Sequence, residues 1–228
     1  MVSMESFQAD RRIVEVFPSQ EPSRPIVYLN TFQRMGERVL QVLRARNCPD
    51  VTLVAISGLD WNHDMAPWAI PPISSDDTPC TGGADDFLEL LKGSIIPKAE
   101  GPLGGSIPWR GIAGYSLAGL FAVYAAFKTE LFSRVASMSG SLWFPGFMAF
   151  TDEREPMRLP DHLYLSLGEG ECQSENPYLA CVEANTLKVR DDFAARGVDT
   201  CFRLNPGDHY AQPIERTAAG IQWLVERG

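Results

Sequence analysis

Short apolar runs alternate along this chain with segments in which apolar residues recur every three or four positions. Such runs are typical of strands buried on both faces, and the segments between them are typical of helices that connect parallel strands. The pattern therefore predicts an α/β fold, a three-layer αβα sandwich with a mostly parallel, twisted sheet. We expect strands at residues 13–17, 24–30, 51–56, 110–115, 134–139, 162–167 and 200–205.

The helical segments show the same regularity. In residues 34–46, Val39, Leu40 and Leu43 fall on one face of a helix. Further helices are expected at residues 82–97, directly after Ser116, at 185–197 with Gly197 just beyond the last turn, and at 214–227.

Two connections, residues 57–83 and 143–161, are longer than a crossover between strands requires. Loops of this length often carry function. Neither is long enough to fold as a separate cap domain. We therefore expect residues 1–228 to form a single domain with an open cleft, and the sequence leaves open whether residues 57–83 move as a lid.

The amino-acid composition indicates which kinds of partner the protein can bind. The chain has 20 Lys and Arg against 29 Asp and Glu, so its formal charge is −9. This charge disfavours binding to nucleic acid or to an anionic membrane. The first residues lack the apolar segment of a secretory signal, so we expect a cytoplasmic protein. The sequence leaves the oligomeric state open.

Cysteines and acidic residues give little indication of a metal site. The 5 cysteines form no C-x-x-C pair, so we expect reduced thiols rather than a disulfide framework or a zinc site. Asp60, His63 and Asp64 lie close together, but no second histidine accompanies them. We therefore expect no metal.

Residues 110–121 combine a predicted strand, the stretch Gly-Tyr-Ser-Leu-Ala-Gly and an alanine-rich helix. Nucleophilic serines occur in this strand–turn–helix setting, where the sharp turn requires small residues two positions before and after the serine. Gly114 and Ala118 meet that requirement, although the commonest pattern has glycine in place of Ala118. We predict that Ser116 is a nucleophile; an ordinary tight turn is the alternative.

A serine nucleophile needs an imidazole to take its proton, and the chain offers His63, His162 and His209. His63 precedes the serine, and His162 begins a strand at the end of the sheet where active sites do not form. His209 follows the last predicted strand, in a turn with Pro206 and Gly207, as the chain order Ser-acid-His requires. We predict that His209 is the base.

The orienting carboxylate should follow the strand at residues 162–167, where the loop contains Glu169, Glu171 and Glu175. A carboxylate there would accept a hydrogen bond from the imidazole and stabilise its charge. We choose Glu171, and the other two glutamates remain alternatives. Asp208, beside the predicted base, is expected to be structural.

Acyl transfer also needs two backbone N–H groups directed at the developing oxyanion. One should belong to Leu117 and the other to Thr31 or Phe32, with Thr31 slightly preferred.

Aromatic residues follow several predicted strands, and they suggest a binding site for a flat, apolar group. Packing of the long loops onto the sheet is the alternative for each of them. The candidate substrate-binding residues are Trp61, Asn62, Trp68 and Trp143.

Four stretches together resemble a known group of proteins. The first is GYSLAG at 114–119, and the second is SGSLWF at 139–144, which is similar to the pattern S-x-S-[FLI]-W. The third is LGEGE at 167–171, which is similar to a G-x-x-[DE] loop that carries the acid. The fourth is GDHY at 207–210, which is similar to a G-x-H loop that carries the base. The chain resembles, over nearly its whole length, the "putative esterase" group of α/β-hydrolases, which includes esterase D, S-formylglutathione hydrolases, siderophore esterases and some feruloyl esterases. The resemblance implies an α/β-hydrolase fold, with Ser116, Glu171 and His209 as nucleophile, acid and base.

These observations together predict a cofactor-free serine carboxylesterase that acts on small-molecule esters with small acyl or aromatic, feruloyl-like groups. An acyltransferase with the same triad, which passes the acyl group to an alcohol or sugar, is a second hypothesis. A catalytically inactive hydrolase scaffold that serves as a binding module is a third, because a fold alone does not establish an activity.

Overall fold

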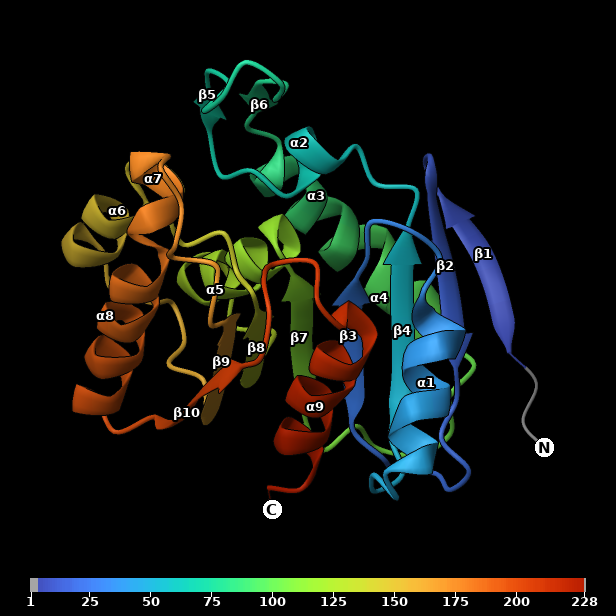
Figure 1. Cartoon of the computed structure of the whole chain (residues 1–228). Helices are drawn as coiled ribbons and strands as arrows, with labels where there is room; N and C mark the ends of the chain where they lie inside the picture. Colours follow the sequence, from blue (N-terminus) through green and yellow to red (C-terminus); the bar gives the residue numbers. More distant parts are fainter. Residues whose placement is uncertain (1–3, 228) are drawn as a thin grey trace.

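The computed structural model describes residues 4–227, and most of its strands lie in one sheet. The strands are β1 (Glu5–Ala9), β2 (Arg12–Phe17), β3 (Ile26–Asn30), β4 (Thr52–Ser57), β5 (Ala69–Ile70), β6 (Cys80–Thr81), β7 (Arg110–Tyr115), β8 (Arg134–Met138), β9 (His162–Gly168) and β10 (Asp199–Asn205). Eight of them form a sheet in the order β1-β2-β4-β3-β7-β8-β9-β10 (Figure 1). From β4 to β10 all neighbours are parallel, whereas β1 pairs antiparallel with β2, and β2 pairs antiparallel with β4.

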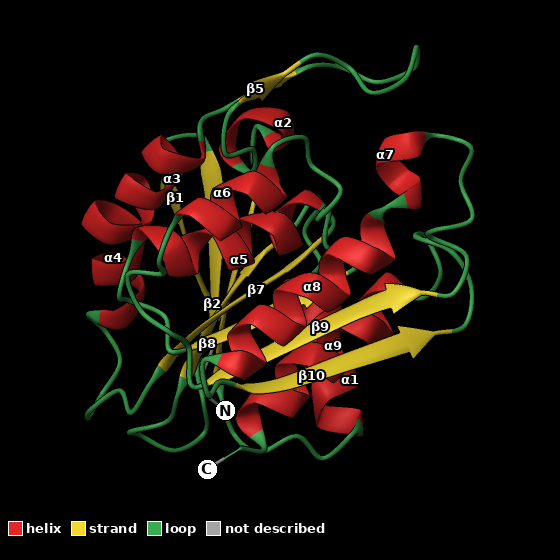
Figure 2. Cartoon of the chain, turned by 90° about the vertical axis from the view of Figure 1, so that its left-hand side faces the viewer, coloured by secondary structure: helices red, strands yellow, loops and turns green. Residues whose placement is uncertain are grey.

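Helices cover both faces of this sheet, as Figure 2 shows from the side. They are α1 (Gly36–Ala45), α2 (Trp61–Asp64), α3 (Ala84–Leu90), the π-helical segment η1 (Leu91–Ile95), α4 (Ile96–Glu100), α5 (Leu117–Lys128), α6 (Phe147–Glu153), α7 (Pro177–Ala180), α8 (Val182–Ala195) and α9 (Pro213–Val225). Buried residues of α1 and α9 pack on one face, and those of α3, η1, α4, α5 and α8 pack on the other. The predicted three-layer α/β sandwich is confirmed.

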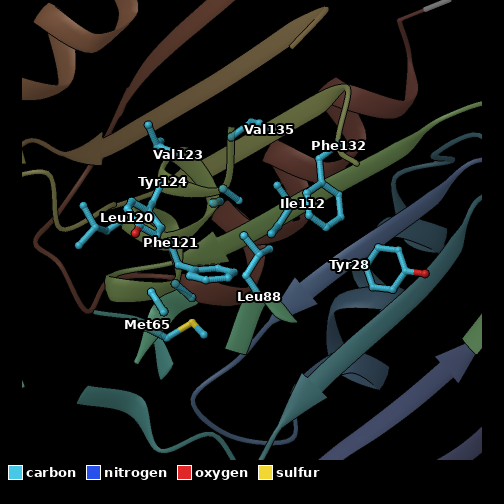
Figure 3. Packing of buried hydrophobic residues seen from close by; sticks show 14 of the residues in the cluster. Tyr28, Met65, Leu88, Ile112, Leu120, Phe121, Val123, Tyr124, Phe132 and Val135 are labelled. Atoms are coloured by element: carbon cyan, nitrogen blue, oxygen red, sulfur yellow. The ribbon is translucent and has the colours of Figure 1, made fainter. Parts of the chain in front are cut away.

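Burial on both faces explains why the central strands are continuous apolar runs. Every residue of β3, β4 and β8 is buried. Side chains alternate between the two layers, so that Val27 and Leu29 face α1 and α9, while Tyr28 joins the opposite core with Ile112 and Phe121 (Figure 3). Helix α5 is buried from Leu117 to Phe127, as expected of a helix that is apolar on all sides.

The structure adds elements that the pattern did not predict. Strand β1 forms an antiparallel edge, the short strands β5 and β6 form a hairpin within residues 57–83, and α2, α6 and α7 lie in the connecting segments. The helix expected to stop at Pro97 continues to Glu100, and the π-helical turn η1 runs directly into α4, in which Pro97 is the second residue.

None of the helices within residues 4–227 combines the length and apolar character needed to cross a membrane.

Candidate active site

The turn between β7 and α5 holds Ser116 in a rare backbone conformation. Its φ is +60° and its ψ is −127°, in a region that residues other than glycine seldom occupy. A Cβ added at Gly114 would lie 2.2 Å from the carbonyl oxygen of Ala118, so no side chain fits there. The small residues around Ser116 are therefore a steric requirement of the turn. Strain of this kind is typical of functional sites.

Ser116, His209 and Glu171 come together above the carboxyl ends of the strands. The Oγ of Ser116 lies 3.1 Å from Nε2 of His209, and Nδ1 of His209 lies 2.8 Å from Oε2 of Glu171. The three residues follow β7, β10 and β9, respectively, at the sheet edge where sites of parallel sheets form. A serine, an imidazole and a carboxylate linked in this way can transfer a proton from the hydroxyl as it attacks.

The alternative residues lie elsewhere. Glu169 and Glu175 are exposed, and neither side chain takes part in a hydrogen bond among the described residues. His63 is bonded to Oγ1 of Thr81 at 2.8 Å, so it supports β6. His162 is at the amino end of β9, as predicted, and pairs with Asp199.

The carboxylate of Glu171 is buried and surrounded by donors. Oε1 accepts hydrogen bonds from the amide of Gly168 at 2.6 Å and from the hydroxyl of Ser139 at 2.7 Å. Burial by itself would raise the pKa of Glu171, but the hydrogen bonds from His209, Ser139 and Gly168 outweigh it and lower that pKa. The side chain is therefore held as an anion beside the imidazole.

The preference for Thr31 as an oxyanion donor is wrong. Its amide donates to the carbonyl oxygen of Ile56 at 2.8 Å, continuing the ladder between β3 and β4, and so cannot reach a ligand. The amides of Phe32 and Leu117 donate to no described residue. These two N–H groups remain available to bind an oxyanion.

A cleft of about 310 Å³ opens above Ser116. Trp61, Asn62 and Trp143 line it, but Trp68 does not. The Trp68 ring packs against Phe144, and its Nε1 donates to a carbonyl at 3.0 Å, so Trp68 fixes the loop instead. The prediction that Trp68 binds substrate is therefore replaced by its alternative, packing of the loop onto the sheet.

Several other residues that line the cleft were not singled out in the sequence. Ser141 and Tyr210 lie in the SGSLWF and GDHY stretches, after β8 and β10. The others lie in the β5–β6 hairpin, in α7 or at the start of α8, and they include Ile70, Ile73, Asp77, Cys80, Leu179 and Val182. The β5–β6 hairpin and the segment before α7 are joined by a hydrogen bond, in which Nδ2 of Asn176 donates to the carbonyl oxygen of Ile73 at 2.9 Å. Residues 57–83 thus form part of the cleft wall.

A model of the family described as "Putative esterase" matches residues 28–182 of the chain. The chain belongs to this family. It is accordingly a hydrolase that acts on ester bonds.

Other proteins are similar to this esterase in sequence or in fold. This esterase is 21% identical over 218 residues to "Uncharacterized protein YbbA" of Bacillus subtilis (strain 168). The matched region covers 88% of this chain and 85% of that protein. Its fold matches that of a siderophore hydrolase, EstA, from Aspergillus nidulans with a TM-score of 0.77, at 20% identity and coverage of 98% and 93%. An IroE-like serine hydrolase from Shewanella oneidensis matches with a TM-score of 0.80, at 19% identity and coverage of 98% and 80%. The esterase therefore has the α/β-hydrolase fold.

Proposed function

We propose that this esterase works through an acyl-enzyme on Ser116, with His209 as general base and Glu171 as the orienting acid. The observation that carries the proposal is the unbroken chain of contacts of 3.1 Å and 2.8 Å from the Ser116 hydroxyl to the Glu171 carboxylate. The strained turn at Ser116 supports it independently.

In the first half of the proposed reaction, Ser116 Oγ attacks the ester carbonyl carbon while its proton moves to Nε2 of His209. The tetrahedral oxyanion accepts hydrogen bonds from the amides of Leu117 and Phe32. The carbon–oxygen bond to the alcohol then breaks, and His209 returns the proton to the leaving alcohol. In the second half, His209 takes a proton from water as the water attacks the acyl-enzyme. The bond from the acyl carbon to Ser116 Oγ then breaks, the acid leaves, and His209 returns the proton to Oγ.

The proposed substrates are neutral esters with a small acyl or an aromatic, feruloyl-like group. Trp61, Trp143 and Tyr210 provide flat apolar walls, and no Lys or Arg is among the described residues that line the cleft. Solved structures with a similar fold include a siderophore hydrolase and an enterobactin and salmochelin hydrolase. The carboxylates that line the cleft are Asp77 and Glu171, and their negative charge favours neutral esters over strongly anionic, iron-loaded ones.

Labelling with a fluorophosphonate tests the nucleophile. We expect one adduct by intact-protein mass, mapped to the peptide containing Ser116, and no adduct on Ser116→Ala. Ser141→Ala is the matched control, because Ser141 Oγ lies only 3.5 Å from Ser116 Oγ. An adduct that persists on Ser116→Ala would contradict the assignment.

Initial rates on acetyl, butyryl, feruloyl and iron-free catecholate siderophore esters test the substrate class. We expect the neutral esters to be cleaved with the higher kcat/KM. Adding acceptor alcohols separates hydrolysis from acyl transfer, and we expect the free acid as the product. Faster cleavage of the siderophore esters would redirect the substrate proposal and leave the triad intact.

A further inference from the structure

Helix α9 contains a buried arginine next to the triad. The Arg216 side chain is only 3% exposed. A guanidinium is seldom buried unless its donors are matched by acceptors, because removing a charge from water is costly. Neither the sequence motifs nor the proposed reaction assigns a role to this residue.

The guanidinium contacts all of the segments that carry the triad. Nη1 donates to the hydroxyl oxygens of Tyr115 and Ser139, each at 3.1 Å, and lies 3.4 Å from Oε1 of Glu171. Nη2 donates to the carbonyl oxygen of Pro206 at 3.0 Å. Tyr115 precedes the nucleophile and Pro206 lies in the loop that leads to His209, so one side chain joins the ends of β7, β8, β9 and β10.

The surrounding backbone leaves no spare room around this side chain. A Cβ added at Gly168 would lie 2.9 Å from Nη2 of Arg216 and 2.5 Å from the carbonyl oxygen of Gly207. The acid loop and the base loop thus approach each other where the guanidinium lies. The arginine fits a space that exists only because residue 168 has no side chain.

We infer that Arg216 is a positioning residue that holds the Glu171 carboxylate in place for His209. The inference rests on the proposed function. Oε1 of Glu171 is held by the Gly168 amide, Ser139 and Arg216, so Oε2 is directed at the imidazole. The bond from Tyr115 Oη to the carbonyl oxygen of His209, at 2.7 Å, extends the same network to the base.

The positive charge has a second effect. The titratable groups around Glu171 are His209, Arg216, Tyr115 and Cys172, and Arg216 is the fixed cation among them. Asp77 also lines the cleft, together with Tyr210. Without the cation, the Glu171–His209 pair gains a proton more readily, because a nearby positive charge opposes protonation. The acidic limb of the pH–rate profile should then move to higher pH.

The test compares Arg216→Met with Arg216→Lys, using kcat and KM for p-nitrophenyl acetate across pH. We expect Arg216→Met to lower kcat about 10- to 100-fold with little change in KM, since a small displacement of a catalytic group is costly. Its acidic limb should move up by roughly one pH unit. Arg216→Lys should keep the wild-type limb, because it retains the charge, but should recover kcat only in part, because an ammonium group cannot reproduce the forked contacts.

A double-mutant cycle with Glu171→Gln separates positioning from a purely structural role. If Arg216 acts through Glu171, either substitution at Arg216 should have a much smaller effect on kcat in the Glu171→Gln background. Equal effects in both backgrounds, or an unshifted limb in folded Arg216→Met, would overturn the inference. If Arg216→Met does not fold, the cycle with Arg216→Lys decides in the same way. If Glu171→Gln alone leaves kcat/KM unchanged, it is the proposed triad that fails.

Discussion

Strands β9 and β10 carry a histidine–carboxylate pair at each of their two ends. At the carboxyl ends, Nδ1 of His209 lies 2.8 Å from Glu171, and at the amino ends, Nδ1 of His162 lies 3.0 Å from Asp199. By residue type and distance the two pairs are nearly the same. Only their surroundings distinguish them.

Those surroundings differ in burial and in what faces the imidazole. The Glu171 side chain is 5% exposed, whereas that of Asp199 is 49% exposed and is shared with the half-buried Arg227. The Nε2 of His209 faces the Ser116 hydroxyl. The His162 ring instead packs edge-on against Trp223, with centroids 6.0 Å apart. A histidine–carboxylate pair is therefore no indication of chemistry until a nucleophile in a strained turn accompanies it.

Replacing each histidine tests this difference most strongly. We expect His209→Gln to lower kcat about 10⁶-fold, because loss of the base in a serine triad has an effect of that size. His162→Gln should leave kcat within about twofold, since it lies at the opposite end of the strands. Steady-state rates on p-nitrophenyl acetate measure both, and comparable losses in the two variants would remove the distinction.

Replacing each carboxylate is the next comparison. Glu171→Gln should lower kcat about 10⁴-fold, because an amide cannot stabilise the imidazolium that forms during the reaction. Asp199→Asn is the matched control and should retain kcat. If both variants keep full activity, one of the exposed glutamates, Glu169 or Glu175, becomes the candidate acid.

The two ends of β7 offer a comparison in stability. Gly114→Ala should lower the free energy of unfolding by at least about 2 kcal/mol, because the new methyl group meets backbone atoms of Ala118. At the amino end, a Cβ on Gly111 would lie 3.3 Å or more from its neighbours, so Gly111→Ala should cost less than about 1 kcal/mol. Urea unfolding of the two variants measures the difference, which would vanish if the turn could relax.

The pH dependence of stability gives the smallest effect. Interactions in the fold lower the pKa of Glu171 from its ordinary value of 4.5, so its contribution is present above that pH and is lost as the pH falls toward the lowered pKa. As the pH falls below about 5, Glu171→Gln should therefore lose less stability than the wild type. The pKa of Asp199 is also lowered, but solvent screens that exposed group, so Asp199→Asn should resemble the wild type. Denaturant unfolding at several pH values makes the comparison, and a larger loss in Glu171→Gln would contradict it.

The sequence predicted the central strands because they are covered on both faces. Strands such as β4 and β8 consist wholly of buried residues, so they appear as unbroken apolar runs. Strand β1 was not predicted because it lies at an edge and only Ala9 is fully buried. Its residues show no comparable run.

The site residues were predicted from the order of motifs along the chain. The errors came from strand pairing and loop paths, which that order does not specify. Which amide at the end of β3 is free depends on the ladder with β4, so Thr31 and Phe32 look alike in sequence. Trp68 and Trp143 both follow strands, but only the path of each loop decides which ring reaches the cleft. Arg216 was not identified because an arginine in an amphipathic helix is ordinarily exposed.

The contacts of Arg216 also bear on when the site is assembled during synthesis. The chain emerges from a ribosome with its N-terminus first, so the Ser116 turn is made well before His209 and before α9, which carries the guanidinium. Until that last helix docks, the two loops lack the contacts that Arg216 makes to both, and they are joined by bonds such as that from the amide of Gly170 to the carbonyl oxygen of Gly207, at 3.1 Å. A nascent chain therefore contains Ser116 without the other members of the proposed triad, and the contacts of Arg216 can form only when translation has passed residue 216.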